Sequence, residues 1–233
     1  MVKDYKISEP FFEYGPKCYM YGETLVEMAK GLDKLAEKYD VDVILDIPDT
    51  EIYNVAKNVK RVHVYSQHMD SIPVGRGMGR TLPEAVKAAG AVGVMLNHAE
   101  RKLTIDEIEK AIKRADELGL ATMVCADSIE EVKAVAKLGP NILVAEPTEL
   151  IGTGKPADKE YVDEVIRVIK EINPAIKPFP SAGITKGEDC YNIIKAGASA
   201  SGCSSAIAKA ENPLKLAEEM ISAVRRAYDE TRK

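Results

Sequence analysis

The sequence predicts an α/β protein folded as a closed (β/α)8 barrel. Short apolar runs alternate with longer segments of helical period along the whole chain, which is typical of βαβ units and a parallel sheet. Eight such alternations fit within 233 residues, and 45% of the residues are hydrophobic, so the chain can bury a sizeable core. We expect residues 1–233 to form a single domain. An open doubly wound sheet is the alternative, because the pattern alone does not show closure.

The predicted strands are short apolar runs bounded by polar or turn-forming residues. They are expected at Phe11–Tyr14, Val43–Leu45, Val62–Tyr65, Val92–Leu96, Ala121–Cys125, Ile142–Ala145, Ile176–Phe179 and Ala198–Cys203. The last run has almost no β-branched or large apolar residues, so its assignment depends on spacing rather than on propensity.

The segments between these strands carry apolar residues at helical spacing. Helices are expected at Glu23–Lys38, Glu51–Ala56, within 82–90, and at Ile105–Leu118, Ser128–Leu138, Lys159–Ile172, Lys186–Ala196 and Pro213–Thr231. Thr104 and Glu107 have the spacing of a capping box, and Pro213 suits the first position of a helix.

Composition excludes several classes of protein. The formal net charge is -5, with 32 Lys and Arg against 37 Asp and Glu, so no global basic field favours nucleic acid or an anionic membrane. The sequence contains no run of about 18 apolar residues, the length that a membrane-spanning helix needs. The four cysteines form no CxxC pair, which argues against a zinc site or a dense disulfide framework. We expect a cytoplasmic protein that needs neither a metal nor an organic cofactor.

Reactive side chains follow several predicted strands at equivalent positions. Lys17 follows the first strand, His68 and Asp70 the third, His98 and Glu100 the fourth. The carboxyl ends of barrel strands form the active face, so these side chains converge if the barrel closes.

Glu146 ends the sixth strand and begins the stretch EPTELIGTGK. Pro147 fixes φ on one side of the loop, and Gly152 and Gly154 allow dihedrals that bulkier residues cannot reach. This composition suits a lid beside a catalytic base. The alternative is an exposed connection with a solvated glutamate.

Small residues follow the last two strands. SAGITKGED comes after the seventh and CSSA after the eighth, where barrels often bind phosphate through backbone N–H groups. For Ser181–Gly183 alone, a tight turn and helix cap is an equal alternative; together with Gly152 the two segments favour an anion site. A carboxylate, an imidazole and an ammonium beside such a site suit proton abstraction next to a carbonyl, with the oxygen of the enediolate stabilised by His98 and Lys17.

The segments AVGVMLNHAE, AEPTELIGTGK and SAGITKGED resemble the triosephosphate isomerase family, in particular its compact archaeal branch. The resemblance covers nearly the whole chain and implies a TIM barrel that interconverts dihydroxyacetone phosphate and glyceraldehyde 3-phosphate. By this resemblance Glu146 is the base, His98 the electrophile, Lys17 the cation near the substrate oxygen and Glu100 a supporting carboxylate. It also implies that a homodimer or homotetramer forms, that His68 is structural, and that phosphate is bound by Gly152, Ser181, Ser204 and Ser205.

The chain departs from the family pattern at several positions. Gly15 and Pro16 replace an asparagine and an aromatic residue, Ala99 replaces a serine, and Met78 replaces a threonine at the tip of a loop that crosses between subunits. The eighth strand is built of small residues, and Ala206 occupies a glycine position. These changes leave two alternatives: a paralogue that isomerises another short sugar phosphate, such as a tetrose phosphate, or a non-catalytic barrel that binds a phosphorylated metabolite. An aldolase is disfavoured because no strand carries a convincing Schiff-base lysine.

Overall fold

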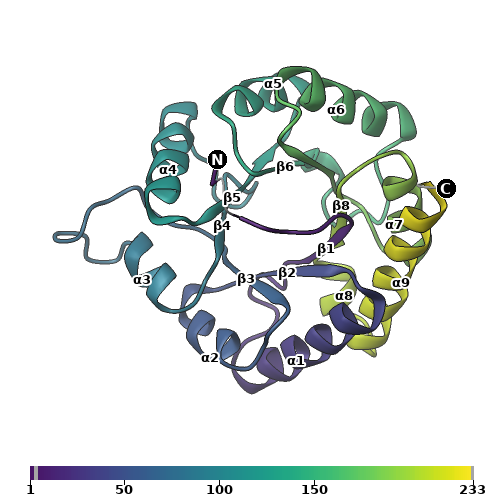
Figure 1. Ribbon diagram of the computed structural model, residues 1–233, viewed down its shortest axis with the longest axis horizontal. Coiled ribbons are helices and arrows are strands. Elements are labelled where there is room, and N and C mark those ends of the chain that lie inside the picture. The colour runs from purple at the N-terminus through teal and green to yellow at the C-terminus, as the bar shows by residue number, and fades with distance from the viewer. Residues whose placement is uncertain (3–4, 232–233) are drawn as a thin grey trace.

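The computed structural model describes residues 1–2 and 5–231, and within them eight parallel strands surround a central axis with the helices outside (Figure 1). The strands are β1 Phe11–Tyr14, β2 Asp42–Ile47, β3 Val62–Ser66, β4 Gly93–Leu96, β5 Ala121–Ala126, β6 Ile142–Ala145, β7 Lys177–Pro180 and β8 Ala200–Cys203. From β1 to β7, each strand pairs with the next one along the chain, and β8 pairs with β1. β7 and β8 form no regular pairing. The predicted (β/α)8 fold is confirmed.

The barrel closes between β7 and β8 through a sparse seam. The Ser199 N–H donates to the Pro178 carbonyl at 2.9 Å, whereas the N–H groups of Lys177 and Ser181 point the other way, to carbonyls beside or within β6. Pro178 and Pro180 occupy the positions that would face β8, and proline has no N–H to donate. β7 therefore gives β8 only carbonyl acceptors, and the open sheet is ruled out although no regular ladder spans the seam.

The helices follow the predicted order with small shifts at their ends. They are α1 Gly22–Tyr39, α2 Ile52–Ala56, α3 Pro83–Ala88, α4 Ile105–Leu118, α5 Ile129–Leu138, α6 Lys159–Ile172, α7 Gly187–Lys195, α8 Ser205–Ala208 and α9 Pro213–Thr231, with 3-10 turns at Asp49–Glu51 and Thr148–Leu150. The capping box of Thr104 and Glu107 is present, and Ser128 caps α5 through a bond from the Glu131 N–H. No helix in the described part of the chain combines the length and apolar character needed to cross a membrane.

Two of the shifted boundaries have a clear structural cause. The eighth strand begins at Ala200 rather than Ala198, because the chain only joins β1 in regular pairing from that residue on. The helix predicted from Glu51 begins as a 3-10 turn at Asp49 and becomes an α-helix at Ile52. The four-residue α8 and the turn at Thr148–Leu150 were not predicted, since segments this short carry no measurable helical period.

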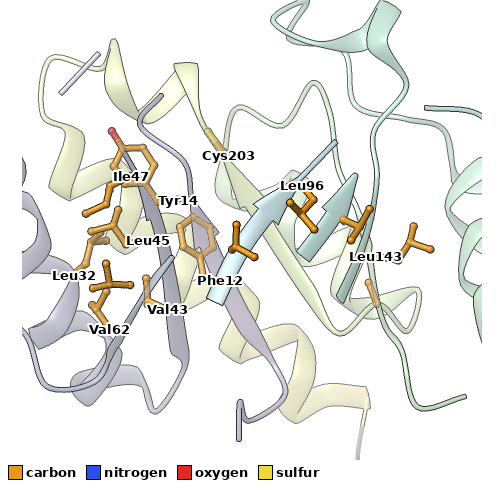
Figure 2. Close-up of a cluster of buried hydrophobic side chains, with 14 of the residues drawn as sticks. Phe12, Tyr14, Leu32, Val43, Leu45, Ile47, Val62, Leu96, Leu143 and Cys203 are labelled. Carbon is orange, nitrogen blue, oxygen red and sulfur yellow. The ribbon is translucent and has the colours of Figure 1, made fainter. Parts of the chain in front are cut away.

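Strand alternation divides the core into two layers. The larger layer lies between the strands and the helices, and Figure 2 shows Phe12 and Tyr14 of β1 in it together with side chains of neighbouring strands. The smaller layer fills the inside of the barrel and includes Phe11 and Phe179, whose rings meet edge to face. Glu13 lies between Phe12 and Tyr14 in sequence and therefore turns inward.

The segment of residues 5–10, before β1, covers the amino end of the barrel. It crosses the barrel axis in Figure 1, and Ile7 packs among the inward-facing side chains while the hydroxyl of Tyr5 bonds to that of Tyr65 at 2.5 Å. The carboxyl ends of the strands remain open at the opposite end, where the predicted reactive residues lie.

Candidate active site

A cavity of about 650 Å³ opens at the carboxyl ends of the strands, within the size range of ligand sites. Every site residue predicted from the sequence lines it, although the residues come from separate βα units: Lys17, His98, Glu100, Glu146, Gly152, Ser181, Ser204 and Ser205. The closed sheet thus brings together side chains that are up to 188 residues apart in sequence (205 less 17).

Glu146 enters the cavity from the end of β6. The alternation of that strand turns Val144 into the barrel, and Glu146 follows two residues later with its N–H bonded to the Ala126 carbonyl at 2.8 Å. Burial raises the pKa of the Glu146 carboxyl, while the positive charge of Lys17 opposes that shift. A carboxylate with a raised pKa is a stronger proton acceptor than one in water.

His98 faces Glu146 with a defined tautomer. Its Nδ1 accepts a hydrogen bond from the Glu100 N–H at 3.1 Å, so in the neutral ring the proton is on Nε2. That Nε2 lies 3.6 Å from Oε2 of Glu146, too far for a hydrogen bond between them. Burial, followed by the charge of Lys17, lowers the pKa of His98 and favours the neutral ring.

Asn97 sets the path of the chain into His98. It has φ of 59°, and its side-chain amide donates to the Cys125 carbonyl at 2.9 Å and to the Glu131 carboxylate at 2.8 Å. Asparagine tolerates this left-handed conformation better than most residues. The chain therefore turns sharply at the end of β4, and His98 is presented from a rigid support.

Lys17 is held between two partners at the edge of the cavity. Its Nζ contacts Oε1 of Glu100 at 2.6 Å, and its carbonyl accepts from the Gln67 side chain at 3.2 Å. Lys17 has φ of 51°, a left-handed conformation that costs about 1–3 kcal/mol for a residue with a side chain. The hydrogen bond from Lys17 lowers the pKa of the Glu100 carboxyl.

The loop after Glu146 forms an exposed edge of the cavity. Gly152 and Gly154 have φ of 72° and 70°, and the Thr148 N–H at the start of the loop is bonded to Asp127 at 2.8 Å. At its other end the loop lies against Gly183, because a Cβ there would be 1.9 Å from the Lys155 carbonyl oxygen. Glycine is required at that contact.

The part of the cavity lining that follows β7 and β8 is made of small residues. The Ser181 N–H donates to the Ala145 carbonyl at 2.8 Å, and Ala182 follows with φ of 89°. The buried Oγ of Ser204 has no hydrogen-bond partner in the described part of the chain, and Ser205 begins α8 beside it. An unpaired buried hydroxyl in a concave site suits an anionic ligand.

Two buried carboxylates that line the cavity were missed in the sequence. Glu13 in β1 and Asp46 in β2 are 7% and 3% exposed, and both line the cavity. Glu13 is the one carboxylate in the apolar strand FFEY, and Asp46 follows the apolar run Val43–Leu45 inside DVILDI; these positions were the signal that could have identified them. Lys209, after α8, adds a further cation at the cavity edge.

His68 and Met78 lie apart from the facing pair of Glu146 and His98. His68 contacts Asp70, with Nε2 3.6 Å from Oδ1, and lies between the main cavity and a neighbouring one of about 340 Å³. Met78 is fully exposed in the long loop that projects between β3 and α3 (Figure 1). Ala206, by contrast, lines the main cavity.

Comparison with known proteins identifies relatives along almost the whole chain. The sequence model of the family described as triosephosphate isomerase matches residues 15–179. A triosephosphate isomerase of Sulfurisphaera tokodaii is 41% identical over 211 residues, which cover 90% of this chain and 92% of the relative. The triosephosphate isomerase of Saccharolobus solfataricus is 39% identical over 209 residues, which cover 89% of this chain and 92% of the relative. The triosephosphate isomerase of Methanosarcina mazei is 35% identical over 223 residues, which cover 94% of this chain and 100% of the relative.

Proposed function

The chain belongs to the triosephosphate isomerase family, and we propose which of its residues perform the chemistry of that isomerase. The reaction interconverts dihydroxyacetone phosphate and glyceraldehyde 3-phosphate, so one proton moves between two adjacent carbons and another between the oxygens that they carry, while the phosphate is unchanged. Such an enzyme needs a base beside the carbons, donors at the oxygens and a fixed site for the phosphate.

Glu146 is the base in this proposal. It removes a proton from the carbon beside the carbonyl and returns it to the neighbouring carbon. Its carboxyl is partly buried at the end of a rigid strand, and the raised pKa strengthens it as an acceptor. The gap of 3.6 Å to Nε2 of His98 indicates that the two side chains share a substrate-facing space rather than a hydrogen bond.

His98 and Lys17 stabilise the oxygen of the enediolate. His98 donates through Nε2–H as a neutral imidazole. The Glu100 N–H fixes this tautomer, because it donates to Nδ1 and so requires that nitrogen to be unprotonated. Lys17 contributes its positive charge, and Glu100 positions that charge through the 2.6 Å ion pair. Together they place donors on the side of the substrate where negative charge develops.

The phosphate is bound at Gly152, Ser181, Ser204 and Ser205. The unpaired Oγ of Ser204 and the exposed loop of Gly152 support this assignment. Closure of the loop over bound phosphate would exclude water from the enediolate, and Gly152 and Gly154 within the loop supply the necessary dihedral freedom. A small phosphorylated sugar is therefore the ligand of the whole cavity.

One observation carries the mechanism: the neutral, tautomer-fixed His98 faces the partly buried Glu146 across the cavity. Side-by-side turnover of triose, tetrose and pentose phosphates tests the function. We expect the triose phosphates to be the best substrates. Absence of turnover with all of them, together with tight binding of a phosphorylated ligand, would support a non-catalytic binding protein instead.

The protein also forms a homodimer or homotetramer in this proposal. The projecting loop presents the large apolar side chain of Met78 to solvent. Such exposure is expected of an interface residue. Sedimentation of wild type and Met78→Glu tests it: the variant should be smaller than wild type if the loop lies in the interface.

A further inference from the structure

Two buried carboxyl groups meet at the floor of the cavity, and the mechanism above does not use them. The β1–β2 register pairs Tyr14 with Leu45, which places Asp46 level with Gly15 one residue further on. An atom at the Cβ position of Gly15 would lie 2.8 Å from Oε1 of Glu13 and 2.9 Å from Oδ1 of Asp46. The two carboxyl groups thus converge on the space that Gly15 leaves free.

The small residues of β8 make room for this pair. Gly202 is the register partner of Glu13, and a Cβ on Gly202 would lie 2.5 Å from Oε2 of Glu13. A larger residue at either Gly15 or Gly202 would displace a carboxyl group. The glycine in β8 and the glycine after β1 are therefore both explained by one feature.

The pair holds a proton near neutral pH. Burial raises the pKa of Glu13 well above its ordinary value, and the negative charge of Asp46 adds to the shift. Burial also raises the pKa of Asp46 to about 6, while the charge of Lys17 opposes that change. Two carboxyl groups in a buried site do not both ionise readily, so one of them remains protonated and they titrate as a pair.

One oxygen of the pair lacks a partner. Oδ1 of Asp46 is buried and, within residues 1–2 and 5–231, makes no hydrogen bond. Asp46 lines the same cavity as Glu146, His98 and Lys17. An unsatisfied buried polar atom costs about 1–3 kcal/mol, so its position beside a ligand cavity indicates that a ligand atom completes it.

We propose that Glu13 and Asp46 form a proton-sharing carboxyl pair that donates a hydrogen bond to a substrate oxygen, as a third donor beside His98 and Lys17. β1 and β2 lie across the barrel from β6, which carries Glu146 (Figure 1). A substrate between them presents one face to the base and the other to the pair. The proton stays on the pair, and no covalent bond forms or breaks there.

A carboxylic acid kept neutral by its surroundings is an effective donor to a developing oxyanion. Lys17 is already paired with Glu100, so an additional neutral donor would stabilise the enediolate without adding another full charge. The inference rests on the proposed function, because it assigns the donor to the enediolate of that reaction.

Steady-state kinetics of four variants test the donor role. Asp46→Leu removes one carboxyl group of the pair with little change in size, and Glu13→Gln replaces the other by an amide, whose N–H donates to Asp46 and keeps Asp46 an acceptor. We expect each to lower kcat by about 10-fold to 100-fold with little change in KM. Asp46→Asn supplies an amide N–H in the same place and should retain most of the activity.

Asp49→Asn is the matched control. Asp49 lines the same cavity, but both its oxygens already accept hydroxyl donors, from Ser66 at 2.7 Å and Thr81 at 2.6 Å. Its kcat should stay near wild type. Wild-type turnover in Asp46→Leu and Glu13→Gln would overturn the inference, as would a loss in Asp46→Asn equal to that in Asp46→Leu. Affinity for inorganic phosphate and circular dichroism verify that each variant folds.

Infrared difference spectroscopy tests the shared proton without any turnover. Wild type at neutral pH should show the band of a protonated buried carboxyl, and that band should disappear in Glu13→Gln and move or disappear in Asp46→Asn. Absence of the band in wild type would contradict the inference. Because this readout is independent of activity, an inactive wild type would refute the proposed function alone.

Discussion

The backbone N–H of Glu100 donates a hydrogen bond to Nδ1 of His98 at 3.1 Å. A protonated Nδ1 would place two hydrogens face to face, so this one contact disfavours the imidazolium and fixes the proton of the neutral ring on Nε2. Burial and the charge of Lys17 lower the pKa of His98 in the same sense. The residue that anchors Lys17 through its side chain therefore controls His98 through its main chain.

Nitrogen NMR of the imidazole should detect this arrangement. Because the folded pKa of His98 lies below the ordinary value of 6.5, the ring should be neutral at pH 6.5 and above. The spectrum should show the Nε2–H tautomer. A signal from Nδ1–H, or an imidazolium at pH 7, would contradict the assigned role.

Glu100→Gln should release Lys17 without unfolding the protein. The ion pair is partly exposed, with 65% of the Glu100 side chain accessible, so its loss should change stability by less than about 1 kcal/mol. Misplacement of Lys17 should nevertheless lower kcat by about 10-fold. The pKa of His98 should also fall further, because the negative charge of Glu100 raises it in wild type.

Glu149→Gln provides the control for that variant. Glu149 lies in the turn just after Glu146 but is exposed and does not line the cavity. Its kinetics should match wild type. If Glu100→Gln also matched wild type in kcat and in the His98 titration, Glu100 would have no positioning role.

Gly183→Ala should disturb the end of the loop over the cavity. A Cβ at Gly183 would lie 1.9 Å from the Lys155 carbonyl oxygen, so the loop must move. We expect weaker phosphate binding and a lower kcat/KM. Gly139→Ala is a matched control, because φ is 70° at Gly139 and 69° at Gly183. A Cβ at Gly139 would have its nearest neighbour 3.7 Å away, so it would cause no clash. Both variants carry the same backbone strain, so equal kinetic losses would show that the loop contact is unimportant.

Asp46→Asn should stabilise the protein at neutral pH more than at acidic pH. Asp46 has a folded pKa of about 6 against an ordinary value of 3.8, so the folded state binds the proton more tightly than the unfolded state. Stability therefore falls as pH rises from about 4 through 6. The variant removes that loss, which is on the order of 3 kcal/mol for a shift of about two pKa units. Thermal unfolding at pH 4 and pH 7.5 measures it, and an equal change at both pH values would contradict the buried-proton account.

The sequence predicted the barrel because each strand except β8 carries its own apolar signal. β8 was placed by spacing alone, and the structure explains the glycine within it: Gly202 must be small to admit Glu13. The ends of α7 and the first turn before α2 shifted by one or two residues, since caps and 3-10 turns depend on local contacts that periodicity does not record.

The predicted site residues all line one cavity because their positions at strand ends follow from the fold. The pairing of Glu13 with Asp46 was not predictable in the same way. Each carboxylate was visible inside an apolar strand, but their meeting depends on the β1–β2 register and on the space left by Gly15. Register is a property of the assembled sheet and not of either strand.

The proton transfer by Glu146 is tested most directly by exchange of substrate hydrogen with solvent. In D2O, wild type should incorporate deuterium at the carbon beside the carbonyl of dihydroxyacetone phosphate, and Glu146→Gln should lose this exchange by several orders of magnitude while inorganic phosphate still binds. Glu146→Asp, with a shorter reach, should lie between them. Deuterium incorporation by Glu146→Gln at the wild-type rate would contradict the assignment of Glu146 as the base.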